Sequence, residues 1–443
     1  MAFFTEIHTL KVAFLTLGCK VNQYETDAMK EQFKRAGAKI VSFRDKADVY
    51  IINTCSVTNV ADKKSRQMLH RAKKKNPQSM VVAVGCYVQA AKEKLKEDSF
   101  VDLIVGNNKK KDIVSIVADY LDHQQRSDHV LDIHHVNEFE EMGISHIEGH
   151  TRAYIKVQDG CNQFCSYCII PYARGRVRSR KLDDVILEIK HLVQQGIKEF
   201  VLTGIHLSSY GVDQEDMNLL SLIQEVAKIQ GVLRIRLGSL EPGIITEEFV
   251  QEIVKIPQLC PHFHLSLQSA CNDTLKRMNR KYTIEEYKDK CNLLRKYYDF
   301  PAITTDVIVG FPGETEEEFA ITKRNLEELN LYEIHVFKYS KRKGTRAETM
   351  PNQVDDSKKH QRSQELLEMT GRQKSDYEKK LCGETVSVLL EETVEIDGIV
   401  YYTGHTMNYV KIGVIGKYLS SNQLVEAIIT DYSAKDFLIA KSV

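Results

Sequence analysis

The feature of this sequence that most constrains its fold is an alternation of apolar runs with amphipathic segments. The expected strands and helices of the first region alternate at residues 11–18, 23–35, 48–54, 62–74 and 80–85. Such an alternation is typical of βαβ units, whose strands pair in parallel. The sequence therefore predicts a parallel α/β domain over residues 10–125.

Six further strand–helix repeats follow this first domain. Their expected strands lie at residues 153–158, 198–204, 234–239, 262–267, 303–310 and 333–340. Eight such units close a (β/α) barrel, so six units predict an incomplete one. We assign this partial (β/α)6 barrel to residues 151–378.

The stretch between the two α/β regions is polar. Residues 126–150 are expected to form a solvated interdomain linker. Residues 119–150 also hold six of the fifteen histidines, including His134 and His135. A histidine metal site is the alternative, although the spacing of these histidines fits no ligand pattern well.

The pattern changes again near the C-terminus. A charged helix is expected at about 355–380, and five short strand-like runs follow between Glu384 and Ser442. This length and pattern fit a small all-β barrel of OB-like character over residues 379–443.

The charge of the chain is balanced, with 61 basic and 61 acidic residues. No strong net field therefore draws the protein to nucleic acid or to an anionic membrane. Contact with RNA would have to come from local basic patches, for which the candidates are Lys73–Lys75, Lys109–Lys111, Arg174–Lys181 and Lys341–Arg346. Because no long apolar run and no basic leader is seen, we expect a cytoplasmic protein without membrane contact.

Ten cysteines in 443 residues are too sparse for a disulfide scaffold, so clustered cysteines indicate metal binding or catalysis. Cys161, Cys165 and Cys168 form a CxxxCxxC pattern after the first barrel strand, where the ligands of (β/α) barrels collect. Three thiolates can hold three irons of a 4Fe-4S cluster and leave the fourth iron open. A zinc knuckle is the alternative, but it needs a fourth ligand.

A second set of three cysteines belongs to the N-terminal domain. Cys19, Cys55 and Cys86 each directly follow an expected strand. The carboxyl ends of parallel strands share one edge of a sheet, and ligands bind there. We therefore expect these thiols to gather as a second metal site, with three unrelated core thiols as the alternative. The other cysteines are expected to be ordinary core or surface thiols, namely Cys260, Cys271, Cys291 and Cys382.

The motif CNQFCSYC, residues 161–168, resembles the cluster loop of the radical S-adenosylmethionine (SAM) superfamily. The resemblance implies that SAM chelates the open iron through its amino and carboxylate groups. It also implies that an electron from the cluster cleaves SAM to a 5′-deoxyadenosyl radical, which the protein positions and shields.

Segments at the ends of later barrel strands are similar to the SAM-binding segments of that superfamily. The resemblance implies that Thr203 and Gly204 meet the methionyl amine and that Ser239 meets the ribose. Gln268 and Arg280 resemble a pair that holds the SAM carboxylate. The run 306–314 resembles the segment beside the adenine, although plain turn chemistry explains its Gly310 and Gly313 equally well.

Two sets of three cysteines, one in each α/β region, resemble the methylthiotransferase family within that superfamily. The resemblance implies two 4Fe-4S clusters, SAM as cofactor and a C-terminal TRAM domain. The stretches 17–25 and 158–180 are similar to the branch that modifies carbon 2 of N6-threonylcarbamoyladenosine beside the tRNA anticodon. Methylthiolation of N6-isopentenyladenosine is the alternative, and a non-enzymatic iron–sulfur redox or RNA-binding protein is an alternative of another class.

The family resemblance also implies partners. These are the tRNA anticodon stem-loop, an electron donor such as flavodoxin or ferredoxin, and a sulfur source, with the chain acting as a monomer. Because a threonylcarbamoyl group carries a carboxylate, its pocket should offer a fixed cation. We hypothesise that one of Arg174, Arg176, Arg178 or Arg180 supplies it, with contact to RNA phosphate as the alternative. No side-chain general base is nominated, since cluster and SAM carry the chemistry.

Overall fold

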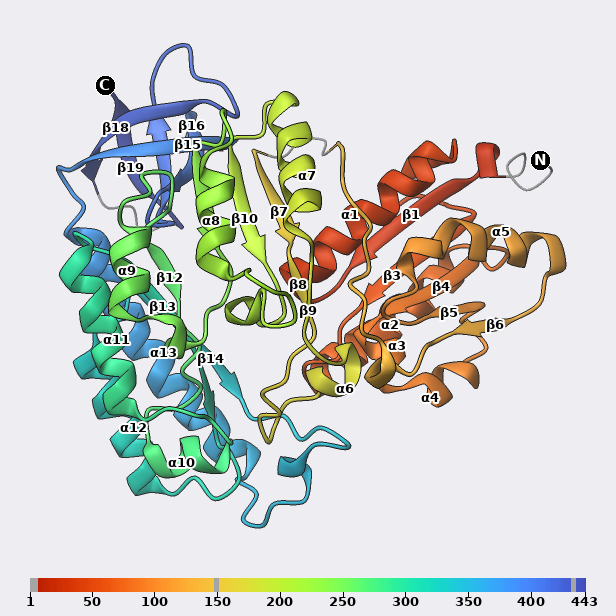
Figure 1. The fold of residues 1–443 in the computed structure, drawn as a ribbon, viewed down its shortest axis with the longest axis horizontal. Helices are drawn as coiled ribbons and strands as arrows, with labels where there is room; N and C mark the ends of the chain where they lie inside the picture. Colours follow the sequence, from red (N-terminus) through yellow and green to blue (C-terminus); the bar gives the residue numbers. More distant parts are fainter. Residues whose placement is uncertain (1–6, 147–150, 432–435) are drawn as a thin grey trace.

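The computed structural model describes residues 7–146, 151–431 and 436–443, which form three regions (Figure 1). In the N-terminal region the described strands form one parallel sheet in the order β2-β1-β3-β4-β5-β6. Its strands are β1 (Lys11–Thr16), β2 (Lys39–Val41), β3 (Val49–Thr54), β4 (Met80–Gly85), β5 (Leu103–Val105) and β6 (Ser127–His129). The predicted parallel α/β fold of this region is confirmed.

Helices cover both faces of this sheet, and strand residues alternate between two cores. Phe14 of β1 packs edge-on against Phe33, with ring centroids 5.8 Å apart, while neighbouring Ala13 faces the opposite core. One face carries α1 (Lys20–Arg35) and α5 (Ile113–His123). The other carries α2 (Asn59–Lys75), α3 (Cys86–Ala90) and α4 (Lys92–Lys96). Because both faces are covered, β3 and β4 are buried along their whole length.

The polar stretch after α5 contributes to this sheet. β6 pairs in parallel with β5, within the stretch that the sequence assigns to a linker. A short 3-10 helix, Ile133–His135, follows, and the His134 ring meets the edge of Tyr172. None of the histidines described in this stretch joins a group of three metal-ligand side chains, and His150 lies outside the described residues.

The second region is the incomplete barrel that the sequence predicts. Parallel strands form two sheets, β7-β10-β11 and β12-β13-β14, and single bridges from Ile235 to Leu259 and from Leu240 to Leu265 join them. The strands are β7 (Arg152–Lys156), β10 (Glu199–Thr203), β11 (Arg234–Leu237), β12 (His262–His264), β13 (Ala302–Val309) and β14 (Glu333–Lys338). A small antiparallel pair, β8 (Gln158–Asp159) and β9 (Arg178–Ser179), frames the loop that carries the cysteine motif.

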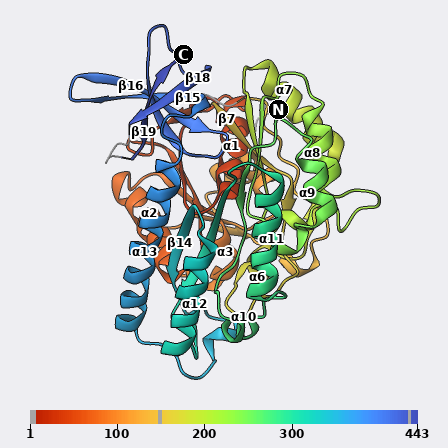
Figure 2. The same ribbon diagram turned by 90° about the vertical axis from the view of Figure 1, so that its left-hand side faces the viewer.

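Helices cover the outside of this barrel, and α11, α12 and α13 lie side by side along one flank (Figure 2). The helices are α6 (Ile170–Arg174), α7 (Leu182–Gln194), α8 (Leu219–Ala227), α9 (Glu247–Ile253), α10 (Asn272–Arg277), α11 (Ile284–Tyr297), α12 (Glu316–Leu329) and α13 (Asp356–Lys379). Alternate strand residues such as Ile155, Phe200 and Ile235 pack under these helices. The residues between them face inward and are often charged, so the interior of the barrel is polar.

The C-terminal region is a closed, mostly antiparallel barrel, as predicted. Its strands are β15 (Thr385–Ile396), β16 (Ile399–Thr406), β17 (Lys411–Ile415), β18 (Leu424–Asp431) and β19 (Leu438–Ser442). The Tyr409 ring stacks on His262 at 5.1 Å and lies under the guanidinium of Arg236 at 4.6 Å. Both contacts are near the amino ends of the (β/α) strands, so the opposite end of that barrel is left for the cysteine loop.

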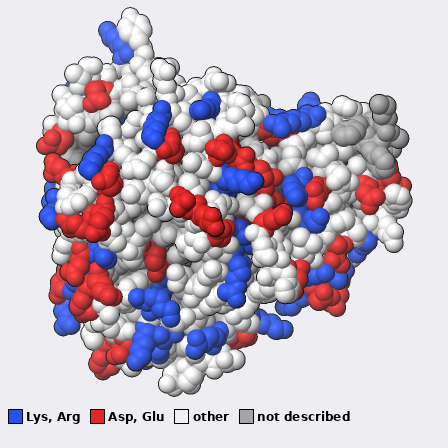
Figure 3. Space-filling model, in the orientation of Figure 1, with Lys and Arg blue, Asp and Glu red and all other residues white. Residues whose placement is uncertain are grey.

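Acidic and basic side chains are interspersed over the face shown in Figure 3. No helix in the described part of the chain combines the length and the apolar character that crossing a bilayer requires.

Candidate functional site

The cysteines of the N-terminal region lie at one edge of its sheet. Cys19 caps α1 just after β1, Cys55 follows β3, and Cys86 begins α3 directly after β4. These three strands are neighbours, so their carboxyl ends bring the cysteines together. At Gly18 the backbone has φ +102°, and a Cβ there would stand 2.9 Å from Cys55 Cβ. The chain therefore needs glycine to bring Cys19 beside Cys55.

A buried arginine from the barrel reaches this edge. Arg174 donates from Nε to Cys86 Sγ at 3.2 Å and from Nη2 to Asn22 Oδ1 at 2.7 Å. Its Nη1 donates to Glu25 at 2.7 Å and to Asp159 at 3.1 Å. Asn22 and Glu25 are one turn apart on α1, a spacing that could have signalled a shared partner in the sequence.

Further buried charges surround Arg174. Lys156 lies 2.9 Å from Glu25 and 2.6 Å from Asp159, and Lys110 lies 3.2 Å from Glu25. Burial would raise the pKa of Glu25, but Arg174, Lys110 and Lys156 outweigh it and hold that pKa well below its usual range. Glu25 and Lys110 belong to the N-terminal region and the others to the barrel, so this network joins the two regions.

Burial also governs the thiols at this edge. Burial raises the pKa of Cys19, although the positive charge of Arg174 acts to lower it. Burial also raises the pKa of Cys55 to about 11. A thiol in such surroundings becomes a stable thiolate when a bound metal supplies positive charge.

The second cysteine set lies in the loop between β8 and α6. Arg280 donates from Nη1 to Cys165 Sγ at 3.2 Å and from Nη2 to Glu241 at 2.9 Å. Burial raises the pKa of Cys161 to about 11 and that of Cys168 to about 12. The loop is held by the backbone of Ser166, which donates to Met278 O at 3.0 Å.

The five residues assigned to SAM lie around this loop at the carboxyl end of the barrel. Thr203 ends β10 and is buried, and Gly204 follows it against the Gln158 side chain, which a Cβ would meet at 2.8 Å. Ser239 is exposed beyond β11. Gln268, with φ +73°, lines a pocket with Cys168. Arg280, as described, contacts the motif itself.

Glu241, which the sequence analysis did not identify, joins two of these segments. Glu241 accepts hydrogen bonds from Arg280 and from His206 Nε2 at 3.3 Å. Burial would raise its pKa, yet His206 and Arg280 lower it. Its position two residues after Ser239 is the only sequence signal available.

Glycines 310 and 313 have φ of +70° and +80°. The Gly310 amide donates to Glu314 Oε2 at 2.6 Å, which closes the turn between β13 and α12. These contacts account for both glycines by turn geometry.

A pocket of about 230 Å³ lies beside the second cysteine set and also contacts the segment that follows Cys55. Val57 and Thr58, just after Cys55, line one side, and Tyr167 and Cys168 line the other. Asp306 also lines it, and with His264 and His335 it forms a group whose ligand atoms lie within 4.8 Å of one another. That group was not foreseen, because its members come from β12, β13 and β14.

Neither cysteine set has the spacing of a single-ion site. Among the described residues, the groups of three ligand atoms within 4.8 Å are the histidine–aspartate group above and one of Cys271, Asp273 and Glu318. Tetrahedral zinc with Zn–S bonds of about 2.3 Å would hold thiolates about 3.8 Å apart. A cubane, whose thiolates bind different irons, accepts wider spacing. Of the remaining cysteines, Cys260 and Cys291 are buried and Cys382 is exposed.

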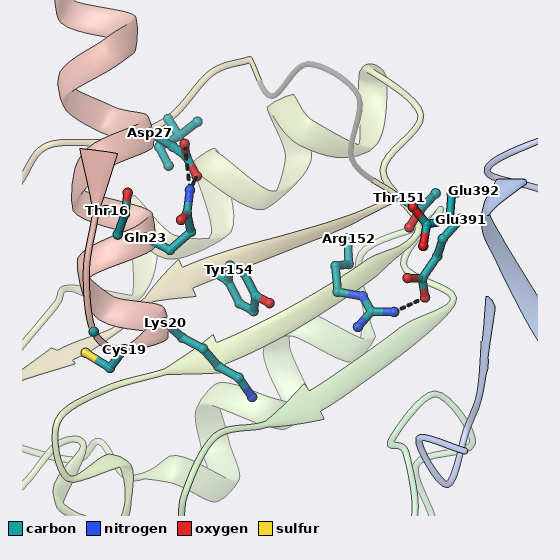
Figure 4. A pocket seen from close by; sticks show the side chains of 12 residues that line it. Thr16, Cys19, Lys20, Gln23, Asp27, Thr151, Arg152, Tyr154, Glu391 and Glu392 are labelled. Atoms are coloured by element: carbon teal, nitrogen blue, oxygen red, sulfur yellow. Dashed lines mark hydrogen bonds and ion pairs between the residues drawn. The ribbon is translucent and has the colours of Figure 1, made fainter. Parts of the chain in front are cut away.

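A larger cleft of about 650 Å³ is lined by Cys19 (Figure 4). Lys20 extends into it from α1, Arg152 and Tyr154 face it from β7, and Glu391 reaches it from the C-terminal barrel. Burial lowers the pKa of Lys20, and Arg236 and Arg152 lower it further.

Comparison with known proteins places this site in a family. Residues 11–106 match the model described as "Uncharacterized protein family UPF0004", and residues 155–326 match the Radical SAM superfamily. The chain is 42% identical over 90% of its length to the Bacillus subtilis protein named threonylcarbamoyladenosine tRNA methylthiotransferase MtaB, of which 89% is covered. The chain belongs to the radical SAM methylthiotransferase family. The family expected from the motifs is thus confirmed.

Two other known proteins are similar to this methylthiotransferase in sequence or in fold. It is 36% identical over 85% of its length to a Thermoanaerobacter pseudethanolicus protein named tRNA-2-methylthio-N(6)-dimethylallyladenosine synthase, of which 81% is covered. A solved structure of the radical SAM methyltransferase TsrM from Kitasatospora setae matches 74% of the chain and 72% of its own, with a TM-score of 0.56 at 16% identity. At that identity the match bears on the fold alone.

The structure narrows the arginine hypothesis for this methylthiotransferase to two of its four candidates. Arg174 is fully buried on Glu25 and Asp159, and Arg180 is paired with Glu188 and Glu141. Every guanidinium nitrogen of both residues already donates to a protein acceptor. Arg178 is buried as well, but its Nε and Nη2 have no hydrogen-bond partner among the described residues. Arg176 is exposed, and its guanidinium lies over the Phe164 ring at 4.7 Å. Binding of the threonyl carboxylate thus stays a prediction for Arg176 and Arg178.

Burial of basic side chains also leaves fewer exposed cations in the expected RNA patches. Lys110 and Arg342 are buried inside two of them, and the patch at 174–181 keeps only Arg176 and Lys181 exposed among its basic residues. These inward side chains serve internal ion pairs, because a buried cation needs a partner.

Proposed function

We propose that this protein transfers a methylthio group to carbon 2 of N6-threonylcarbamoyladenosine in tRNA. Its similarity along nine-tenths of its length to a protein named for that activity carries the proposal. The relatives named for the dimethylallyl substrate share fewer residues with it.

The geometry supports two clusters. Cys161, Cys165 and Cys168 would hold the radical SAM cluster, and Cys19, Cys55 and Cys86 would hold a second one, each leaving one iron open. Thr203, Gly204, Ser239, Gln268 and Arg280 would bind SAM. When bound, these groups supply the radical chemistry that an unactivated C–H bond requires and that acid–base side chains cannot provide.

The protein's own residues would position the cysteines and exclude water. Arg174 holds Cys86 and closes the interface between the two regions. Arg280 and Glu241 fix Cys165 and the segment that follows β11. The pocket beside Cys168 has a mostly apolar lining, which would exclude water from a reactive intermediate.

Several partners follow from this proposal. The substrate would be the anticodon stem-loop of tRNA, and an electron donor such as flavodoxin or ferredoxin and a sulfur source would act with it. We place the protein in the cytoplasm as a monomer, with the domains 10–125, 126–150, 151–378 and 379–443 as assigned from the sequence.

The test is mass spectrometry of tRNA nucleosides from a strain that lacks the gene. We expect the 2-methylthio derivative of threonylcarbamoyladenosine to disappear and its precursor to accumulate, with both reversed by a plasmid copy. Loss of the isopentenyl derivative instead would favour the alternative substrate. Unchanged nucleosides, together with no SAM cleavage by reconstituted protein, would favour a non-enzymatic iron–sulfur protein.

A further inference from the structure

We propose that Lys20 binds the threonyl carboxylate of the substrate nucleoside. This inference rests on the function proposed above. It assigns Lys20 to the recognition of the threonylcarbamoyl substituent, which distinguishes this substrate from an isopentenyl nucleoside.

The position of Lys20 places a cation next to the reacting centre. Lys20 directly follows Cys19 at the start of α1, and its side chain extends into the cleft away from the Cys19 sulfur (Figure 4). The carboxylate of the substituent lies a few bonds beyond the purine edge that carries carbon 2. A lysine beside a cluster ligand therefore has the reach to meet it.

Lys20 is an uncompensated cation. Within the described part of the chain, no carboxylate or carbonyl lies within hydrogen-bonding or ion-pair distance of its ammonium group. The other acidic residues of the cleft have partners of their own, since Asp27 pairs with Lys30 at 3.0 Å and Glu392 lies 3.9 Å from Lys411. Lys20 is exposed to the solvent of the cleft, and an ammonium there without an ion-pair partner can accept an anion.

The charges around Lys20 add to this preference. Arg152 and Arg236 both pair with Glu199, and Arg152 also pairs with Glu391. Arg234 lies 3.7 Å from Glu199 as well. Arg234 donates to the C-terminal barrel and does not line the cleft. Around the Lys20 ammonium, Arg152 and Arg236 are balanced by Glu199 and Glu391, so that Lys20 is the cation in excess.

Lys20 does not serve the neighbouring thiol. The cation that acts on Cys19 is Arg174, and the groups that act on Lys20 are Arg236, Arg152 and Glu199. Figure 4 shows the Lys20 side chain directed into the cleft and not toward the Cys19 sulfur. An isopentenyl group would leave the ammonium without a partner, whereas a threonyl carboxylate would supply one.

The experiment uses the reconstituted enzyme with two anticodon stem-loops. One carries threonylcarbamoyladenosine, and the other carries its threoninamide analogue, in which a neutral amide replaces the carboxylate. The variants are Lys20→Met, Lys20→Arg and, as a matched control, Lys39→Met, which removes an exposed lysine of β2 far from the cleft. Stem-loop affinity is measured by fluorescence anisotropy, and kcat/KM by nucleoside mass spectrometry.

We expect the wild type to prefer the carboxylate substrate and Lys20→Met to lose about 30-fold in affinity and kcat/KM for that substrate alone. Lys20→Arg should keep most of the preference, and iron content and SAM cleavage should stay unchanged in all variants. An equal loss on both stem-loops, or a preference that survives in Lys20→Met, would overturn the inference. If instead the wild type leaves the threonylcarbamoyl stem-loop unmodified, the proposed function itself fails.

Discussion

The two cysteine sets reach similar surroundings by different routes. One is gathered from three strands of a sheet, whereas the other comes from a single short loop. Each has an arginine nitrogen 3.2 Å from a cysteine sulfur, Arg174 at Cys86 and Arg280 at Cys165. Arg174 is buried and pairs with carboxylates from two regions. Arg280 pairs with Glu241, which also contacts His206. We infer that Arg174 stabilises the fold, whereas Arg280 positions the groups of a ligand site.

The largest effect should come from the cysteines themselves. Replacing Cys161, Cys165 or Cys168 by alanine should abolish 5′-deoxyadenosine formation, because the radical SAM cluster is lost. Replacing Cys19, Cys55 or Cys86 should leave SAM cleavage possible but abolish methylthiolation. Iron should fall from about eight to about four atoms per chain in both groups, since each set holds one 4Fe-4S cluster. Identical phenotypes with both clusters intact would end the distinction between the sites.

Replacing Arg174 and Arg280 one at a time should separate their two roles. Arg174→Met would leave Glu25 and Asp159 buried without their main cation, so we expect a loss of about 3–5 kcal/mol in the free energy of unfolding. Arg280→Met should cost less stability, since Glu241 keeps His206, and should instead raise the KM for SAM. Thermal unfolding and SAM-cleavage kinetics measure the two effects. A larger loss of stability in Arg280→Met would reverse the assignment of roles.

A third carboxylate–arginine cluster, around Glu199, donates no hydrogen bond to the six cysteines, and it tests whether a buried carboxylate makes the stability of the fold depend on pH. Burial would raise the pKa of Glu199, but Arg236, Arg152 and Arg234 lower it to about 2. Its stabilisation is therefore complete above its ordinary pKa of about 4.5 and is lost as the pH falls toward 2, in total about 3 kcal/mol.

The measurement is thermal unfolding of the wild type and Glu199→Gln between pH 7 and pH 3. The variant should be less stable at pH 7, and the gap between the two proteins should shrink as the pH falls. A gap that stays constant over this range would show that Glu199 does not titrate with folding.

The smallest effect should come from one added methyl group. In Gly18→Ala the new Cβ meets Cys55, and the positive φ disfavours alanine, so we expect a loss of about 1–3 kcal/mol and weaker binding of the second cluster. SAM cleavage should persist, because the barrel cysteines are untouched. Gly243→Ala is the matched control, since nothing lies within 4 Å of its added Cβ. Equal iron loss in both variants would contradict this reading of Gly18.

The sequence alone determined the order of strands and helices, the parallel α/β region, the six barrel units and the five-stranded terminal barrel. It also predicted that Cys19, Cys55 and Cys86 gather, because parallel pairing brings the carboxyl ends of their strands onto one edge whatever the side chains are, and that the other three share one loop. It missed β2, β5 and β6, since three residues carry too little periodicity to be recognised.

Only the tertiary structure decided which charges are compensated. Arg174 and Arg180 looked available in the sequence but are satisfied by carboxylates that include Glu25 and Glu141, from the other α/β region and the stretch after it. Lys20 looked ordinary but has no such partner among the described residues. A residue type fixes the charge, whereas its neighbours in space fix whether that charge remains free to bind, and those neighbours come from distant parts of the chain.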